Sequence, residues 1–79
     1  MHVRIELDSS LRKYVGRYDA ESGITLDWRP GLTASAIMEE LGIPPDEVKI
    51  VMVNRSAVQP GQEVKGGDVI GLFPLLGGG

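Results

Sequence analysis

The 79-residue sequence contains no cysteine. Disulfides, thiolate metal sites, iron–sulfur clusters and cysteine catalysis are therefore excluded for this chain. A chain of this length forms one small domain. Without disulfides, its single hydrophobic core is barely large enough to stabilise the folded state. The lack of disulfides fits a reducing compartment, so we expect a cytoplasmic protein.

Excess positive charge and long apolar runs are also missing. Eight lysines and arginines face eleven acidic residues, for a net charge of −3. This balance disfavours nucleic acid, because binding to phosphates depends on lysine and arginine. No segment reaches the ~20 apolar residues that cross a bilayer. Met1 is not followed by the basic start and apolar run of a signal peptide. We therefore expect no nucleic-acid partner and no membrane partner.

Histidine and aromatic residues are scarce as well. The single histidine, His2, has no partner nearby in sequence, and we interpret it as a solvated strand residue and not as a catalytic one. The segment from Ser9 to Gly23 holds both tyrosines and three basic groups, a combination that could mark a nucleic-acid patch. Asp19 and Glu21 offset the charge, so we favour a solvated loop with a short helical turn that covers one end of the core.

Two segments before the middle of the chain alternate between apolar and polar side chains, at residues 2–8 and 24–28. A period of two predicts strands with one buried face. The predicted inward residues are Val3, Ile5, Leu7, Ile24, Leu26 and Trp28. Because the segment between them holds no full helix, we expect an antiparallel hairpin and not a parallel crossover.

A helix is predicted over residues 34–41, with Thr33 as its N-cap and Gly42 as its stop. Apolar residues recur there at the spacing of one helical face, namely Ala34, Ile37, Met38 and Leu41. Glu39 and Glu40 are adjacent, point in different directions and are not a carboxylate pair for acid–base work.

The second half of the chain predicts further strands. Residues 48–53 are the most apolar, and we expect that strand to be central in the sheet. A turn at 54–55 leads to short extended pieces near 58–59 and 63–65, and a glycine-rich turn opens the last strand, 69–73. Gly71 within it suggests close approach of another backbone, or a bulge. The element order predicts an α+β domain with one helix on one face of a mixed sheet.

Two stretches resemble a known family, VMVNRSAV from Val51 to Val58 and GGDVIGLFPLLGGG from Gly66 to Gly79. With the element order, they resemble the ubiquitin-like β-grasp proteins of the MoaD and ThiS sulfur-carrier families, closer to MoaD. The resemblance implies a mixed four- to five-stranded sheet with one main helix. It also implies a β-grasp domain over residues 1–76 and a flexible glycine tail over 77–79.

The resemblance further implies that the chain is a sulfur carrier and not an enzyme, with no bound cofactor and no metal. An adenylating enzyme of the MoeB/ThiF type would use ATP to convert the Gly79 carboxylate to an acyl adenylate. Sulfur would then displace AMP and leave a thiocarboxylate. The acceptor would be a MoaE-type large subunit of molybdopterin synthase, or another enzyme of molybdopterin or tungstopterin cofactor biosynthesis.

The residues of the tail suit that task. Glycine alone removes side-chain bulk near the reactive carboxylate of Gly79. Pro74 lacks an amide hydrogen and disfavours further strand pairing. Leu75 and Leu76 cannot both face the core of an extended segment, so at least one is expected to be exposed. The predicted partner-binding residues are Phe73, Pro74, Leu75, Leu76, Gly77 and Gly78.

The tail also departs from the family pattern. MoaD proteins usually carry two prolines and a valine before the terminal glycines, whereas this chain reads Pro-Leu-Leu and then three glycines. The receiving pathway therefore stays open, with thiamine thiazole, transfer RNA or another acceptor as alternatives. A ubiquitin-like modifier that joins lysines of other proteins, and an interaction module with an inert tail, are also alternatives.

Overall fold

The computed structural model describes residues 1–74, and these form a five-stranded sheet in the order β2-β1-β5-β3-β4. The strands are β1 (His2–Leu7), β2 (Ile24–Asp27), β3 (Ile50–Val53), β4 (Ser56–Val58) and β5 (Val69–Phe73). Strands β1 and β5 pair in parallel, and the other neighbours are antiparallel, so the sheet is mixed. The expected fold class is confirmed.

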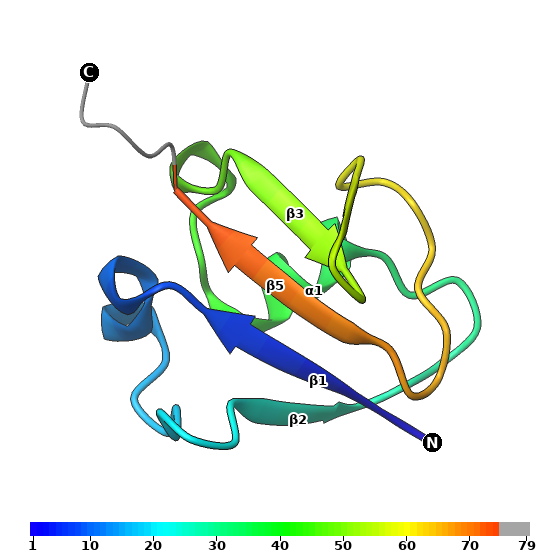
Figure 1. The fold of residues 1–79 in the computed structure, drawn as a ribbon, viewed down its shortest axis with the longest axis horizontal. Coiled ribbons are helices and arrows are strands. Elements are labelled where there is room, and N and C mark those ends of the chain that lie inside the picture. The colour runs from blue at the N-terminus through cyan, green and yellow to red at the C-terminus, as the bar shows by residue number, and fades with distance from the viewer. Residues whose placement is uncertain (75–79) are drawn as a thin grey trace.

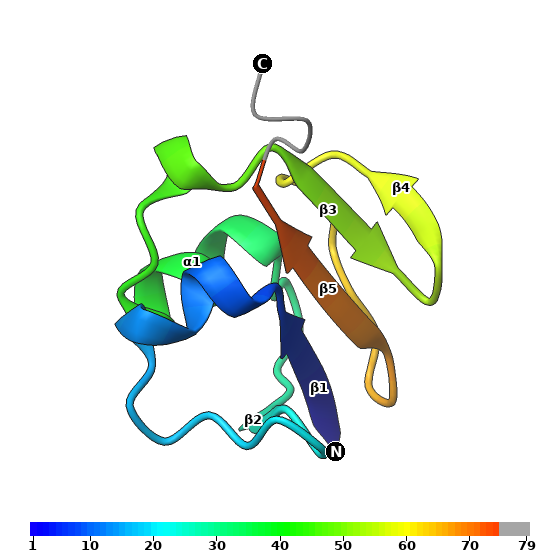
Figure 2. The same ribbon diagram turned by 60° about the vertical axis from the view of Figure 1, so that its left-hand side comes forward.

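One α-helix, α1 (Ala34–Leu41), packs on one face of the sheet, as Figure 1 shows. The 3₁₀ helix η1 (Ser9–Tyr14) lies on the same side, beside α1 (Figure 2). A second 3₁₀ helix, η2 (Pro45–Glu47), connects α1 to β3. The opposite face of the sheet carries no helix from the described part of the chain (Figure 2). The tail predicted at residues 77–79 lies outside the described residues, as do Leu75 and Leu76.

The sequence pattern of α1 explains both of its ends. The Thr33 hydroxyl accepts the backbone N–H of Ala36 at 3.1 Å, and Gly42 ends the helix with φ of 75°. The predicted apolar face is buried against the sheet. Ile43 follows the glycine, donates its N–H to the Met38 carbonyl at 2.9 Å and is itself buried.

The hairpin predicted for the first two strands is confirmed, with Val3 opposite Leu26. The segment between them is more than a solvated loop, because η1 buries Leu11 almost completely. The Tyr18 hydroxyl accepts the backbone N–H of Leu7 at 3.0 Å, and its ring packs against the core. These contacts hold the tyrosine within the fold.

Two placements differ from the sequence prediction. Trp28 follows β2 and is only partly buried, because its indole N–H reaches out to the Val64 carbonyl at 2.8 Å. The strand predicted to be central, now β3, has a neighbour on each side, but the middle of the sheet is β5. The last strand lies in the middle because it pairs with both first strands of the two hairpins, in parallel with β1 and antiparallel with β3.

The turn between β3 and β4 is a two-residue hairpin in which Asn54 and Arg55 both have positive φ, 50° and 73°. The Asn54 side chain accepts the Val69 N–H at 2.9 Å and donates to the Asp68 carboxylate at 2.9 Å. The Asn54 N–H also donates to the Val69 carbonyl. This turn therefore fixes the start of β5.

Three substitutions separate the side-chain bonds of this turn from its backbone strain. Asn54→Ala loses both bonds and keeps the unfavourable φ, and we expect it to lower the free energy of unfolding by about 1–3 kcal/mol. Asn54→Gly should cost less because glycine adopts positive φ freely. Arg55→Gly, which removes no such bond, should be neutral or stabilising. Urea unfolding measures all three, and equal losses in both Asn54 variants would contradict the assigned role of backbone strain.

Candidate functional site

The described part of the predicted site is the end of β5. The Phe73 carbonyl accepts the Lys49 N–H at 2.9 Å, so the strand is held by backbone bonds as far as Phe73. Pro74, the next residue, has no N–H to offer a neighbouring strand. Of the predicted site residues, Leu75, Leu76, Gly77, Gly78 and Gly79 lie outside the described residues.

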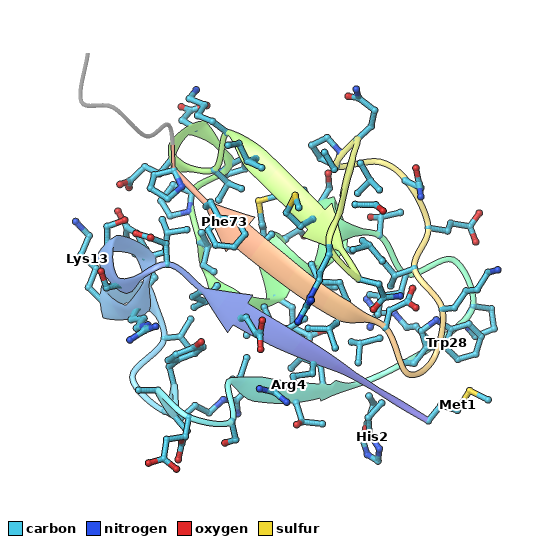
Figure 3. All side chains as sticks on the ribbon, viewed as in Figure 1. Met1, His2, Arg4, Lys13, Trp28 and Phe73 are labelled. Carbon is cyan, nitrogen blue, oxygen red and sulfur yellow. The ribbon has the colours of Figure 1, made fainter. Side chains whose placement is uncertain are left out.

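Phe73 lies on the face of the sheet opposite α1 (Figure 3). Because side chains alternate along a strand, Ile70 and Leu72 of β5 face α1 and are fully buried, whereas Val69, Gly71 and Phe73 face away from it. Adjacent residues of β3 join them on the open face. We call the resulting surface the apolar strip, and its members are Ile50, Met52, Val69 and Phe73.

The apolar strip is partly exposed along its whole length. Ile50, opposite Phe73 in the register, has 36% of its surface exposed. Together with Met1 it is one of two large apolar residues exposed to this degree among the described residues. A contiguous apolar surface next to the strand end is typical of a contact surface for another protein. The sequence analysis expected Phe73 to be such a contact.

Gly71 has the Phe73 ring packed over it. A Cβ atom at position 71 would lie 2.8 Å from Cε2 and 3.1 Å from Cζ of that ring. The sequence analysis predicted a backbone approach or a bulge, and this is wrong, because Gly71 pairs in register with both Glu6 and Met52. The sequence signal for the real contact is the aromatic residue two positions later, on the same strand face.

A hollow of about 450 Å³ opens on this face. Its lining residues are Glu6, Met52, Asn54, Arg55, Val69, Gly71 and Phe73. A second hollow of about 400 Å³ adjoins it and shares Glu6 and Phe73. That second hollow is also lined by Asp8, Glu21 and Arg12. An apolar hollow and a charged one thus meet at Phe73.

Hydrogen bonds stabilise the ionised carboxylate of Asp8 in the second hollow. Asp8 accepts from the Ser10 hydroxyl at 2.8 Å and from the Ser10 N–H at 3.1 Å, and these bonds lower the pKa of its carboxyl. The Arg12 Nε donates to the Leu7 carbonyl at 3.1 Å, and its guanidinium carbon lies 4.9 Å from the centre of the Tyr18 ring. Arg12 is therefore held by the domain itself.

The aromatic residues of the connecting segment are also engaged within the fold. The Tyr14 hydroxyl donates to the Glu47 carboxylate of η2, and the Lys13 ammonium lies 5.3 Å from the centre of the Tyr14 ring. These internal contacts favour a structural role for the tyrosines over a nucleic-acid patch. His2 pairs with Asp27 at 3.4 Å on the surface.

Residues 1–74 contain no group of three or more histidine, cysteine, aspartate or glutamate side chains placed to hold a metal ion. None of the helices in that range has the length and apolar character that crossing a lipid bilayer requires.

A five-stranded mixed sheet that packs on one main helix, with its last strand in the centre, defines a ubiquitin-like β-grasp domain. The chain belongs to the Mut7-C ubiquitin family, whose sequence model matches residues 1–77. The predicted MoaD/ThiS-type β-grasp relationship is confirmed at this level. No curated protein sequence matches the chain significantly.

Solved structures share this fold. SAMP1 from Haloferax volcanii superposes with a TM-score of 0.71 at 20% identity, and the alignment covers 100% of both chains. A protein from Pyrococcus furiosus assigned as molybdopterin converting factor subunit 1 gives a TM-score of 0.69 at 19% identity, covering 94% of this chain and 97% of its own. At these identities the likeness establishes the fold.

The contact between Phe73 and Gly71 can be tested by adding one methyl group. Gly71→Ala forces the ring to move, and we expect a loss of about 1–3 kcal/mol in the free energy of unfolding. Gly61→Ala is the matched control, since no atom lies within 4 Å of its new methyl group. Replacing Phe73 by leucine in the Gly71→Ala background should recover part of the loss. Additive effects of the two changes would contradict the direct contact.

The Asp8 carboxyl provides a pH-dependent prediction. Because its pKa is lowered in the folded state, its contribution to stability is present above the ordinary aspartate pKa and is lost as the pH falls through the folded value. Ser10→Ala removes the hydroxyl donor, so the pKa of Asp8 should rise toward its usual range. Carboxyl chemical shifts followed through an acid titration measure it, and Ser9→Ala should leave it unchanged.

Proposed function

We propose that this chain is a sulfur-carrier protein. Its C-terminal Gly79 would be adenylated and converted to a thiocarboxylate that donates sulfur in molybdopterin or tungstopterin cofactor biosynthesis. One observation carries the proposal: the central strand of a β-grasp sheet ends at Phe73, and Pro74 then leads into a segment with three consecutive glycines, Gly77 to Gly79. The fold shared with the Pyrococcus furiosus protein assigned as molybdopterin converting factor subunit 1 supports it.

The proposed chemistry begins at a group that is unreactive by itself. A C-terminal carboxylate has a pKa of about 3.3–3.7, so at neutral pH it is ionised and a poor electrophile. An oxygen of this carboxylate attacks the α-phosphorus of ATP in the partner enzyme, and pyrophosphate leaves. A hydrosulfide ion from the sulfur donor then attacks the acyl carbon, the bond from that carbon to the AMP oxygen breaks, AMP leaves, and a thiocarboxylate and a proton remain.

In these steps the chain positions its terminal carboxylate and lets it enter the active site of the partner enzyme. It supplies no catalytic side chain. Five residues after Pro74, if fully extended, reach about 17 Å, enough to carry a carboxylate into a recessed active site. Glycine at the last three positions leaves no side chain to obstruct that entry. ATP would bind to the adenylating enzyme, of the MoeB/ThiF type, and this domain would hold no cofactor.

Both proposed partners would contact the same end of the domain. The adenylating enzyme and a MoaE-type sulfur acceptor must each take up the segment that follows Pro74. The apolar strip reaches this point through Phe73 and Ile50. Phe73 to Gly78 are therefore the proposed partner contacts, with Gly79 as the reacting residue.

A second function is favoured by one comparison. SAMP1 is also known from a structure described as a small archaeal modifier protein, with a TM-score of 0.68 over 92% of this chain. A modifier uses the same acyl adenylate, but its carbonyl carbon forms an amide bond with a lysine of another protein. The two functions therefore differ in which nucleophile follows activation.

Intact mass tests the proposal. Protein isolated from its own cells, or incubated with the adenylating enzyme, ATP and a sulfur donor, should gain the mass of sulfur in place of one oxygen atom. A variant that lacks Gly79 should show no gain, while Gly61→Ala should behave as wild type. An unchanged carboxylate in the wild-type protein under these conditions would refute the carrier function. Branched peptides with a glycine remnant on lysine would establish the modifier instead.

A further inference from the structure

Strand β2 forms one edge of the sheet (Figure 1). It pairs with β1, whose backbone groups point alternately to β2 and to β5. The Arg4 and Asp8 N–H groups donate to carbonyls on the β5 side. The odd-numbered residues of β1 therefore bond to β2, and their partners in the register are Ile24 and Leu26.

Thr25 and Asp27 alternate with those bonded residues, so their N–H and C=O groups point away from β1. Both residues are exposed. Outside the strand ladders, no backbone bond within residues 1–74 involves either of them. This edge of the sheet thus offers two donors and two acceptors, a pattern that another strand can extend.

The fold limits the free edge at both ends. The Gly23 N–H already donates to the Asp19 carbonyl at 2.7 Å, and the Arg29 carbonyl accepts the Leu32 N–H at 3.1 Å. Proline, lysine and a β-bulge, which commonly block a sheet edge, are missing from residues 24–27. An incoming strand therefore finds room for one short ladder on this stretch.

A second copy of β2 fits this ladder. When two identical edges pair antiparallel about a two-fold axis at Leu26, Thr25 of each copy lies opposite Asp27 of the other. Each such pair exchanges an N–H···O=C bond in both directions, so every free backbone group of the stretch finds a partner. The Thr25 hydroxyl also lies next to the Asp27 carboxylate of the other copy, to which it can donate.

Charges at the two ends of β2 suit the same arrangement. Gly23 and Arg29 each lie three residues from Leu26. A two-fold axis at Leu26 therefore places Arg29 of one copy beside the Gly23 end of the other. That end carries the exposed carboxylates of Asp19 and Glu21. An acidic end thus meets a basic end twice in the same dimer.

These charges are available in the folded chain. Asp19 accepts the N–H groups of Ser22 at 3.1 Å and of Glu21 at 2.8 Å, and these bonds lower the pKa of its carboxyl. Arg29 pairs with Glu40 at 3.4 Å, and its side chain is 55% exposed. A guanidinium has several N–H donors, so Arg29 can bind a second carboxylate while it keeps this pair.

We propose that β2 is an interface between two copies of this chain, which pair antiparallel along this edge and join their sheets into one continuous sheet. Opposite charges at the two ends fix the antiparallel register and favour a second copy over a strand that lacks them. Because the ladder is short, we expect a weak dimer that forms at high protein concentration. The inference does not depend on the proposed sulfur chemistry.

The dimer leaves both candidate sites accessible. Strand β1 lies between β2 and β5, so the end of β5 at Phe73 is two strands away from the interface. The two-fold axis reverses the direction of every strand, and the two β5 ends therefore point in opposite directions. One dimer thus presents two C-terminal segments to two partner enzymes at once.

A charge swap tests the register. Arg29→Glu and Glu21→Arg each place like charges across the interface, and we expect each variant alone to raise the dimer dissociation constant about tenfold in sedimentation equilibrium. An equal mixture of the two variants has opposite charges at both ends of the mixed dimer, so it should associate as tightly as the wild type. Arg55→Glu and Glu39→Arg, which make the same charge changes outside β2 and its flanking segments, should also associate as the wild type does.

Amide hydrogen exchange locates the interface. As the wild-type concentration rises, the Thr25 and Asp27 N–H groups should exchange more slowly, while those of β4 on the opposite edge stay unchanged. Three results would overturn the inference: a protein that stays monomeric up to millimolar concentration, a mixture that associates no better than its components, or association without protection of these two amides. Rescue by mixing cannot come from variants that fail to fold.

Discussion

Strand β5 is the element on which the rest of the domain depends. It pairs with β1 on one side and β3 on the other, so it joins two hairpins that would otherwise share no sheet. Ile70 and Leu72 are fully buried and fill the centre of the core under α1. The opposite face of the same strand provides Val69, Gly71 and Phe73. One five-residue strand thus supports the fold with one face and the candidate site with the other.

This dual use fixes the position of Phe73, although Phe73 lies close to the end of the described chain. Backbone bonds hold β5 on the β1 side as far as Leu72 and on the β3 side as far as Phe73. Asn54 and Asp68 fix its beginning through side-chain bonds. The point at which the chain leaves the sheet is therefore determined by the core, and Pro74 marks it.

Much of the fold could be predicted from local patterns. The helix could be predicted because the N-cap Thr33, the C-terminal Gly42 and the apolar spacing between them all indicate the same helix. The first hairpin was readable from two alternating segments. Strand order was harder, because apolar content does not say which neighbours a strand has. The most apolar segment was predicted to be the central strand. It forms β3, which pairs with β4 through a tight turn, and the strand in the middle of the sheet is β5.

The candidate site was predictable in part. Phe73 and Pro74 were identified from the sequence, and the structure places them at the end of the central strand. The hollow of about 450 Å³ was not predicted, because its lining residues Glu6, Gly71 and Arg55 lie far apart in the sequence and come together only in the folded sheet. A glycine followed two residues later by an aromatic residue on one strand face is the local signal that was available.

The parallel pairing of β1 with β5 has a consequence for biosynthesis. Arg4 of β1 pairs with Val69 of β5. The first strand to leave the ribosome therefore cannot complete its pairing until the last strand has been synthesised. Contacts between such distant residues form late and slow the folding of small domains. A nascent chain that stops before β5 lacks the centre of its core and is expected to stay unfolded and open to proteolysis. Completion of the fold therefore depends on completion of synthesis: only a chain translated through Phe73 acquires the full core and the apolar strip.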